Sequence, residues 1–245
     1  MSKMVLLDVR LFAGGADLSG NSAKAEVMAE VEEKDATNYR SAGWKEVLGG
    51  LASSTINAEG QWEAGDLSKV DDASWAQLGG VGPWTIGPTD AVVGSLAYLV
   101  NAMRASYKLG DKVGEVAPWS GKAAGSWPVA RGQIAHPPGT ARTTSGTGTS
   151  LQLGAVPAGK RLYATVHVLS VAGTATPTIT ARVESDNATG FPSPVTQLTF
   201  TGATVRGGQI LRTDGTAIAD DWWRIAWTIT GTTPSFLFAA ALGIQ

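Results

Sequence analysis

The chain has 245 residues, of which 43% are hydrophobic and 16% are charged, and its formal net charge is -2. This hydrophobic content is enough to fill a core and excludes a chain that is disordered throughout. Charged residues normally make up about 25% of a soluble domain, so the low value favours a surface covered by neighbouring subunits, although Ser- and Thr-rich β proteins are also lightly charged. The absence of cysteine excludes disulfides, thiolate metal sites and a cysteine nucleophile.

Charge is unevenly distributed along the chain. Residues 1–72 carry 13 acidic and 7 basic side chains, whereas residues 73–245 carry 8 acidic and 12 basic ones. A nucleic-acid-binding protein needs a clustered basic face, which this distribution does not provide. No apolar run approaches the ~18 residues of a membrane span, and Asp8 and Arg10 interrupt the N-terminal run, so we expect neither a membrane segment nor a signal peptide.

The first predicted element is a strand over residues 4–12, "MVLLDVRLF", with one apolar face formed by Val5, Leu7, Val9 and Leu11. A turn rich in Gly, Asp, Asn and Ser follows it. The next segment, residues 23–39, reads "AKAEVMAEVEEKDATNY". Its composition favours a helix, but a period of two slightly favours a strand.

That alternation divides the acidic segment into two faces. One face carries Glu26, Met28, Glu30 and Glu32. The other carries Val27, Ala29 and Val31, which we expect to meet the core.

A loop is predicted over residues 35–50, followed by a strand over residues 52–63. Loops of this length inside a compact domain tend to be functional or disordered. The apolar side chains in and next to it are Tyr39, Trp44, Val47, Leu48 and Leu51. This is too much apolar surface to leave in water, so we expect the loop to pack on a partner.

A short helix is predicted within residues 67–80, with Asp71 or Asp72 near its start and Trp75 and Leu78 on one face. Residues 91–109 are ambiguous between strand and helix, and short strands are expected near 113–117 and 129–135. Residues 136–150, "HPPGTARTTSGTGTS", have the composition of a linker or a long surface turn.

After residue 150 the pattern is all-β. Strands are predicted over 162–171, 176–185, 195–205, 222–230 and 235–244, in the manner of a sandwich or half of a barrel. In "DWWRIAW", Trp223, Ile225 and Trp227 share a face that favours a core, while Trp222 leaves open a carbohydrate platform. Arg224, next to Trp222, is a candidate for stacking over an aromatic ring.

Catalytic groups are scarce. The two histidines are too few for a His-based metal site or triad; we expect His136, before two prolines, to be exposed and His167 to lie on a half-buried strand. The pairs Asp71–Asp72 and Asp220–Asp221 read as a helix start and a turn. We therefore expect no enzyme, no cofactor and no metal ion.

Three stretches resemble one family when taken in order. They are "DVRLFAGGADLSG", the acidic "AEVMAEVEEKDATNY" and "GWKEVLGGLASSTINAEGQW", with looser similarity at "VGEVAPWS" and in the C-terminal strands. Together they resemble the major tail tube proteins of long non-contractile-tailed bacteriophages (siphophages), especially those of actinobacterial hosts. The resemblance covers about the first 65 residues well.

The resemblance implies a mainly β fold of two packed antiparallel sheets with a short flanking α-helix. Such subunits form rings, usually homo-hexamers, that stack into a tube with a continuous inner β-barrel. It also implies a tail-tube core over residues 1–135 with a long inter-ring loop over 35–50, then the linker or surface turn over 136–150. Residues 151–245 then complete the tube fold, form an outer decoration, or make a second tube unit that gives pseudo-hexameric trimers.

Carried onto this sequence, the resemblance implies a tube lumen lined by Glu26, Glu30 and Glu32, with a solvated outer face as the alternative. It implies that the inter-ring loop makes contacts through Tyr39, Arg40, Trp44, Lys45 and Leu48. The implied partners are other copies of the chain, a tape measure protein, a tail terminator, baseplate or distal tail proteins, and DNA that passes without specific binding. The implied location is the virion, after assembly in the host cytoplasm. The rival function is a carbohydrate-binding β-sandwich of a tail-associated or secreted protein.

Overall fold

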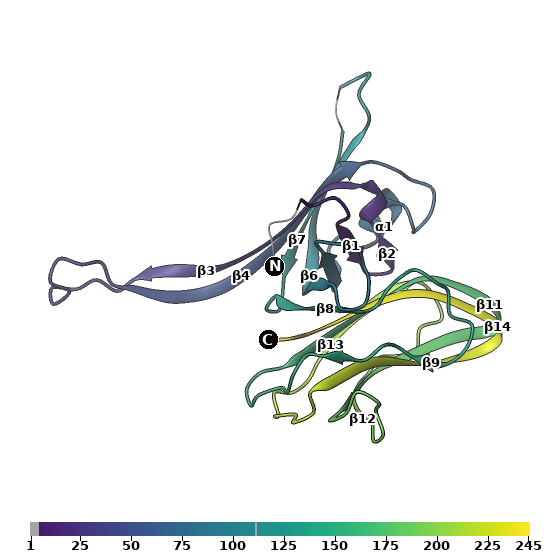
Figure 1. The fold of residues 1–245 in the computed structure, drawn as a ribbon. Helices are drawn as coiled ribbons and strands as arrows, with labels where there is room; N and C mark the ends of the chain where they lie inside the picture. Colours follow the sequence, from purple (N-terminus) through teal and green to yellow (C-terminus); the bar gives the residue numbers. More distant parts are fainter. Residues whose placement is uncertain (1–4, 111) are drawn as a thin grey trace.

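The computed structural model describes residues 5–110 and 112–245, and antiparallel β-strands dominate it (Figure 1). The strands are β1 (Arg10–Ala13), β2 (Ala16–Asp17), β3 (Ser22–Asp35), β4 (Val47–Gln61), β5 (Val81–Gly87), β6 (Leu96–Leu109), β7 (Pro118–Gly125), β8 (Ala130–His136), β9 (Gly146–Thr147), β10 (Leu151–Gln152), β11 (Leu162–Asp186), β12 (Val195–Thr199), β13 (Gly207–Arg212) and β14 (Trp222–Ile244). The helices of the described residues are a 3-10 turn (Ser19–Asn21) and α1 (Val70–Ala76). The predicted mainly β class with a short helix is confirmed.

The N-terminal strands form a curved antiparallel sheet in the order β3-β4-β7-β6-β5-β1-β2. Its concave face and α1 enclose a first core, to which each of these strands except β3 contributes a buried apolar side chain. Representative members are Leu11, Ile56, Trp84, Val100 and Trp119. Val27 of β3 packs against this core from the side.

Strand β8 joins the two halves of the chain. It pairs with the first residues of β6 on one side and with the last residues of β14 on the other. Hydrogen bonding therefore continues from the N-terminal sheet into the C-terminal strands, and all 14 strands of the described residues belong to one connected network. A further core, which includes Phe12, Leu99, Ile134 and Tyr163, fills the junction.

Strands β11 and β14 are long enough to pass through two layers. Residues 162–172 of β11 pair with 235–244 of β14, and residues 178–186 pair with 222–230. Between these two paired stretches both strands bend. As a result, the second paired stretch folds back over the first (Figure 1). The two layers face each other across the largest core, which includes Val166, Val183, Trp223 and Phe238. This part is a small β-sandwich.

Backbone geometry at the bends explains how a strand can reverse without ending. Ala175, Thr176 and Thr233 adopt positive φ angles of 55°, 52° and 47°, respectively, which are strained for residues with a Cβ. At Gly231, φ is 112° and an added Cβ would lie 2.7 Å from the backbone of Pro177. The two strands thus cross at close range where glycine alone fits.

Several predicted boundaries are wrong. Of the strand predicted over 4–12, Met4 lies outside the described residues and the strand begins only at Arg10, because the preceding residues have no partner strand; Val5 and Leu7 are exposed. The strand predicted from residue 52 begins at Val47, so the loop over 35–50 is shortened to residues 36–46. The strand expected near 113–117 lies instead at β7.

The helix is found within the predicted residues 67–80 and spans Val70–Ala76. Val70, Ala73 and Ser74 are buried, whereas Trp75 and Leu78 are exposed. The two acidic residues of its first turn, Asp71 and Asp72, are where the sequence put them, and they suit the helix dipole. The ambiguous region 91–109 resolves into a loop and β6.

In the C-terminal half, four of the predicted strands are parts of only two observed strands, β11 and β14. Residues 162–171 and 176–185 belong to β11, and residues 222–230 and 235–244 belong to β14. Residues 136–150 run along β14: Arg142 exchanges backbone hydrogen bonds with Phe236, and β9 pairs with Ala226 and Trp227.

Candidate assembly surfaces

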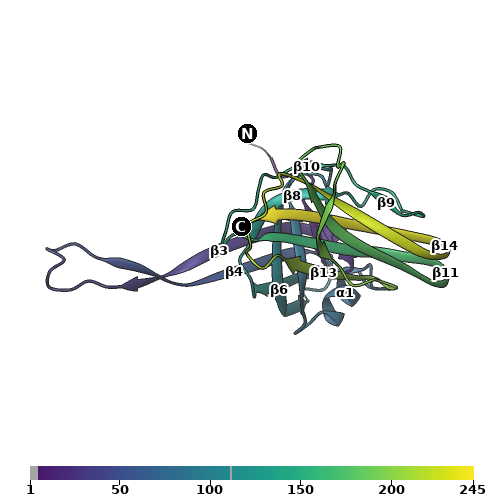
Figure 2. The same cartoon turned by 90° about the horizontal axis from the view of Figure 1, so that it is seen from below.

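The most prominent surface feature is an arm made of the outer parts of β3 and β4. β7 pairs with β4 only from Thr55 to Gln61, so residues 47–54 of β4 have β3 as their only strand partner among the described residues. Both views show this hairpin projecting away from the body (Figures 1 and 2). A two-stranded hairpin is at best marginally stable in water on its own. The arm therefore lacks the packing that would normally hold such strands.

The arm exposes apolar side chains along its length. They are Met28, Val31, Tyr39, Trp44, Val47, Leu48 and Leu51. Val31 is 60% exposed, and Ala29 is exposed as well, so the expectation that Val27, Ala29 and Val31 all meet the core holds for Val27 only. The reason is that β7 ends opposite Thr55, and the described residues hold no third strand to cover the rest.

The acidic residues of β3 occupy the other face of the arm. The register runs without a shift from Lys24 to Val31, so Glu26, Met28 and Glu30 share one face. This face points away from the first core because Val27, on the opposite side, packs against that core. The strand predicted from periodicity is confirmed, and so is the alternation of these side chains.

Lysines partly neutralise this face. Lys24 lies 3.4 Å from the Glu26 carboxylate and 3.9 Å from Glu59, and Lys34 forms an ion pair with Glu32. Glu30 has no ion pair among the described residues. All these groups are exposed, so each pair contributes little to stability.

The tip of the arm, residues 36–46, brings together the predicted contact residues. Tyr39 is fully exposed and Trp44 is 81% exposed, while Arg40 and Lys45 are exposed next to them. Leu48 lies just behind the tip and is 62% exposed. The tip is locally ordered by side-chain bonds to the backbone: Asp35 accepts from the N–H of Thr37, and Asn38 accepts from the N–H of Arg40.

Two of the unpaired strand edges in the described part of the chain lie on strands of the N-terminal sheet next to the arm. One is the outer edge of β3, since β3 pairs only with β4. The other is the outer part of β6: beyond Arg104, which bonds to Gly79 and Gly80, residues 105–109 pair only with β7. Strands β3-β4-β7-β6 are thus bounded by the free edge of β3 on one side and, on the other, by a free edge of β6 that is limited to residues 105–109. Such edges are ready to pair with another chain.

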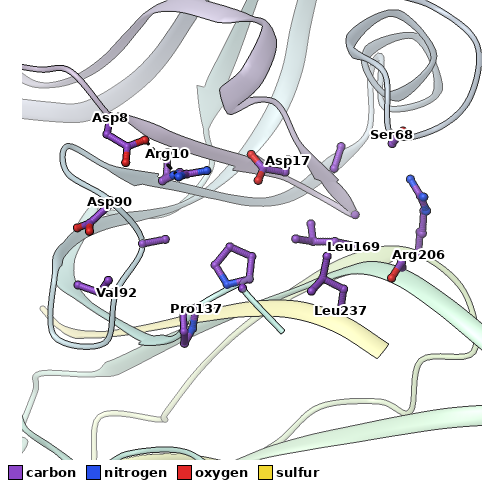
Figure 3. Close-up of a pocket in the computed structure, with 16 residues that line it drawn as sticks. Asp8, Arg10, Asp17, Ser68, Asp90, Val92, Pro137, Leu169, Arg206 and Leu237 are labelled. Carbon is purple, nitrogen blue, oxygen red and sulfur yellow. Dashed lines mark ion pairs between the residues drawn. The ribbon is translucent and has the colours of Figure 1, made fainter. Parts of the chain in front are cut away.

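A cleft of about 600 Å³ lies between the β1–β2 turn and the C-terminal strands (Figure 3). Its wall combines Asp8, Asp17 and Asp90 with Arg10 and Arg206. Asp8 is paired with Arg10 at 3.2 Å, and Asp17 accepts bonds from the backbone and hydroxyl of Ser19. No histidine lines it, and the described residues contain no group of His, Cys, Asp or Glu suited to a metal ion.

Both histidines are buried structural groups. His167 bonds through Nδ1 to the Gly14 carbonyl at 2.7 Å and through Nε2 to the Thr85 hydroxyl at 2.8 Å. His136 is 2% exposed and its ring stacks on Phe238 at 4.1 Å between centroids, so the expectation of an exposed His136 is wrong. The cause is that β8 extends to His136 and carries it under β14 before the two prolines begin.

The aromatic segment of β14 forms core rather than a platform. Trp223 and Ile225 are fully buried and Trp227 is nearly so, as predicted. Trp222 is half-buried on the opposite face. Arg224 lies 4.2 Å from the ring centroid of Phe191 and binds Glu184, which confirms its predicted stacking. This arrangement offers no row of exposed rings to a sugar.

Sequence reasoning missed the buried charged side chains Glu184 and Asp186 on β11 and Arg104 on β6. The alternation Val100, Ala102, Arg104 placed Arg104 on the core-facing side of β6, and this was the signal that would have found it. The unpaired outer edge of β6 was also missed, because strand neighbours depend on contacts between distant parts of the chain.

No family model matches the chain, and no curated protein matches it. Among solved structures, a chain from the virion of a native gene transfer agent particle is 17% identical, with 51% of this chain and 95% of that chain covered and a TM-score of 0.41. A chain from the tail of an empty gene transfer agent particle with C6 symmetry is 18% identical, with coverages of 45% and 81% and a TM-score of 0.37.

A third solved structure is the SPP1 Dit protein, described as a paradigm of the hub adsorption apparatus in phages that infect Gram-positive hosts. It is 9% identical, with 97% of this chain and 99% of that chain covered and a TM-score of 0.34. The three are thus described as parts of a virion, a tail and an adsorption apparatus. At these identities and TM-scores, the likeness assigns no function to this chain.

No helix in the described residues is long and apolar enough to cross a membrane.

Proposed function

We propose that the chain is a structural subunit that polymerises through its strand edges and its arm. More specifically, we propose that it is a tail tube subunit of a long non-contractile-tailed bacteriophage. The observation that carries the proposal is the arm, a two-stranded hairpin with exposed apolar residues on a chain with few charges. Such a hairpin needs a partner surface to be stable. The sequence resemblance to tail tube proteins is consistent with that requirement.

Ring formation follows from the two free edges. The free edge of β3 and the free edge of β6 over residues 105–109 lie on opposite sides of strands β3-β4-β7-β6, so β3 of one subunit can add to this end of β6 in the next. A head-to-tail contact of this kind closes into a ring when its rotation divides a full turn. Closure also removes the unpaired edges that would otherwise promote aggregation. We propose a homo-hexameric ring.

In such a ring the acidic face of β3 lines the lumen. Glu26 and Glu30 lie on the sheet face that turns away from the core, and Glu32 follows them along β3 at the register shift between Val31 and Glu33. Repeated carboxylates repel DNA phosphates within the screening length of about 8–10 Å at physiological salt. A basic lining would instead bind phosphates and retard the DNA. The lumen therefore conducts DNA during ejection without binding it.

The arm tip is proposed to contact the adjoining ring through Tyr39, Trp44 and Leu48, with Arg40 and Lys45 beside them. Residues 151–245 complete the tube fold, an assignment supported by the ladder between β8 and β14. The other partners are the tape measure protein, the tail terminator and the baseplate or distal tail proteins, and the location is the virion.

Electron microscopy of the purified protein at increasing concentration tests the proposal. We expect rings or tubes with a central channel, and a sedimentation coefficient that rises with concentration. A protein that stays monomeric at high concentration would contradict it. Binding of glycans by such a monomer would support the carbohydrate-binding alternative instead.

A further inference from the structure

A second, smaller pocket of about 340 Å³ lies beside α1, between the start of β5 and the start of β13. Its walls are mainly glycine and small apolar residues, and its charged lining residues are Arg104 and Arg206. No Asp or Glu lines it. Arg206 is already paired with Asp66 at 3.8 Å, so the unbalanced charge of the pocket is that of Arg104.

The imbalance centres on Arg104, which is 1% exposed. Its Nε and Nη1 are buried and have no hydrogen-bond partner in the described residues. Its Nη2 has only a long bond of 3.4 Å to the amide oxygen of Gln77. Burial lowers the pKa of Arg104 to about 10, so the guanidinium remains charged at neutral pH. A buried charge without a counter-charge costs several kcal/mol.

The residues around Arg104 accommodate its guanidinium but do not neutralise its charge. The guanidinium carbon lies 4.5 Å from the ring centroid of Trp84, a contact that offsets part of the desolvation. On its other side Gly121 makes room, because a Cβ there would lie 2.9 Å from Nη1. The fold thus accommodates a guanidinium whose charge has no acidic partner among the described residues.

Water alone does not resolve the imbalance. The other unpaired buried polar groups of this region are the indole N–H of Trp119 and the hydroxyl of Ser74 on α1. Arg104 and Trp119 can only donate, so a bridging water would accept their bonds but would bring no negative charge. An oxyanion accepts several bonds and supplies the missing charge.

We propose that the pocket beside α1 binds one small oxyanion, phosphate or a carboxylate group, through the guanidinium of Arg104. Gln77 stands at the entrance: it lines the pocket, touches Nη2 and is tied to the Ala13 carbonyl at 3.0 Å. An anion that displaces the Gln77 amide gains Arg104 as a forked donor, with Arg206 at the rim. The anion is either free in solution or a carboxylate side chain of a second copy.

Thermal unfolding in sodium phosphate, sodium acetate and sodium chloride at equal ionic strength tests the pocket. For the wild-type chain we expect phosphate or acetate to raise Tm saturably, by about 3–6 °C at ten times the dissociation constant, relative to chloride. In Arg104→Met this anion response should disappear, and the variant should be at least as stable as wild type in chloride. Arg131→Met, an exposed arginine on β8, is the matched control and should keep the response.

No rise over chloride in the wild type, or an equal rise in Arg104→Met, would overturn the proposal. Arg104→Lys covers the case in which the methionine variant fails to fold: it keeps the charge but lacks the fork, and a response at least twofold weaker is expected. A response equal to wild type in Arg104→Lys would also count against it. If the chain polymerises, repeating the titration on the polymer distinguishes the sources: loss of the response identifies a neighbour's carboxylate, and retention identifies a free anion.

Discussion

At the scale of single residues, the two histidines make the stability of the fold depend on pH. Burial lowers the pKa of His136 to about 4, and the nearby Arg142 charge acts in the same direction. Burial also lowers the pKa of His167 to about 4, although its bond to the Gly14 carbonyl acts in the opposite direction. Both imidazoles are therefore neutral in the folded chain at pH values where the unfolded chain takes up a proton.

The sign of the pH dependence follows from these values. Each histidine contributes stability that is complete above the unfolded pKa of 6.5 and is lost as the pH falls toward 4. Between pH 7 and pH 5 we expect each to reduce the free energy of unfolding by about 2 kcal/mol. Urea unfolding of the wild type and of His136→Phe at both pH values measures this: the variant should lose about half as much as the wild type. An unchanged pH dependence in the variant would contradict the prediction.

The burial of these two histidines also shows what could not be predicted from the local sequence. His167 was expected on a half-buried strand, but it is fully buried and residues 162–169 of β11 are buried on both faces. His136 precedes "PP", a local signal for an exposed loop, yet its neighbours are Phe238 and Trp227, about a hundred residues further along the chain. Local sequence does not contain that contact.

At the scale of elements, the arm and the bent strands show which sequence patterns predict the observed strands correctly and which do not. The period of two identified β3 against its helix-forming composition, because alternation sets which face meets the core. The bends in β11 and β14 were misread as turns between separate strands, since Gly173, Pro177, Gly231 and Pro234 are ordinary turn signals. Continuous pairing on both sides of each bend is a non-local property that no single segment reveals.

We predict that the arm tip is required for tube formation. Replacing Tyr39 and Trp44 together with alanine should prevent tube formation, because both side chains are exposed in the subunit and buried only in the proposed contact. The free energy of unfolding of the subunit should change by no more than about 0.5 kcal/mol per substitution. Sedimentation and electron microscopy measure the first effect, and urea unfolding the second.

A matched control for the arm is the pair Val195→Ala and Val205→Ala, which are exposed apolar positions in the C-terminal half. These changes should leave assembly intact. Normal tubes from the Tyr39 and Trp44 double variant would show that the tip does not join rings.

At the scale of the whole molecule, the proposed ring would turn the uneven charge of the chain into a charged lining of the channel. Changing Glu26, Glu30 and Glu32 to lysine should replace repulsion of DNA by attraction at every ring, and slow DNA ejection from assembled particles by roughly tenfold. Raising the salt to 1 M should restore much of the rate, because the screening length falls to about 3 Å. Time-resolved release of DNA from particles measures both effects.

Lysine substitutions outside β3 distinguish an effect of the lumen charge on the ejection rate from an effect of the net charge. Glu115→Lys and Asp90→Lys change exposed carboxylates outside β3 and should leave the ejection rate unchanged. An unchanged rate in the triple lysine variant, with intact particles, would mean that these carboxylates face solvent on the outside of the tube.

The ladder through β8 also has a mechanical consequence. Because β6, β8 and β14 share backbone hydrogen bonds, and a core fills their junction, the two halves of the chain have no hinge between them. Each subunit should therefore behave as a stiff block under load. A filament built from such blocks would have to curve by opening and closing gaps at the joints between subunits, with the arms as tethers that keep those joints from separating.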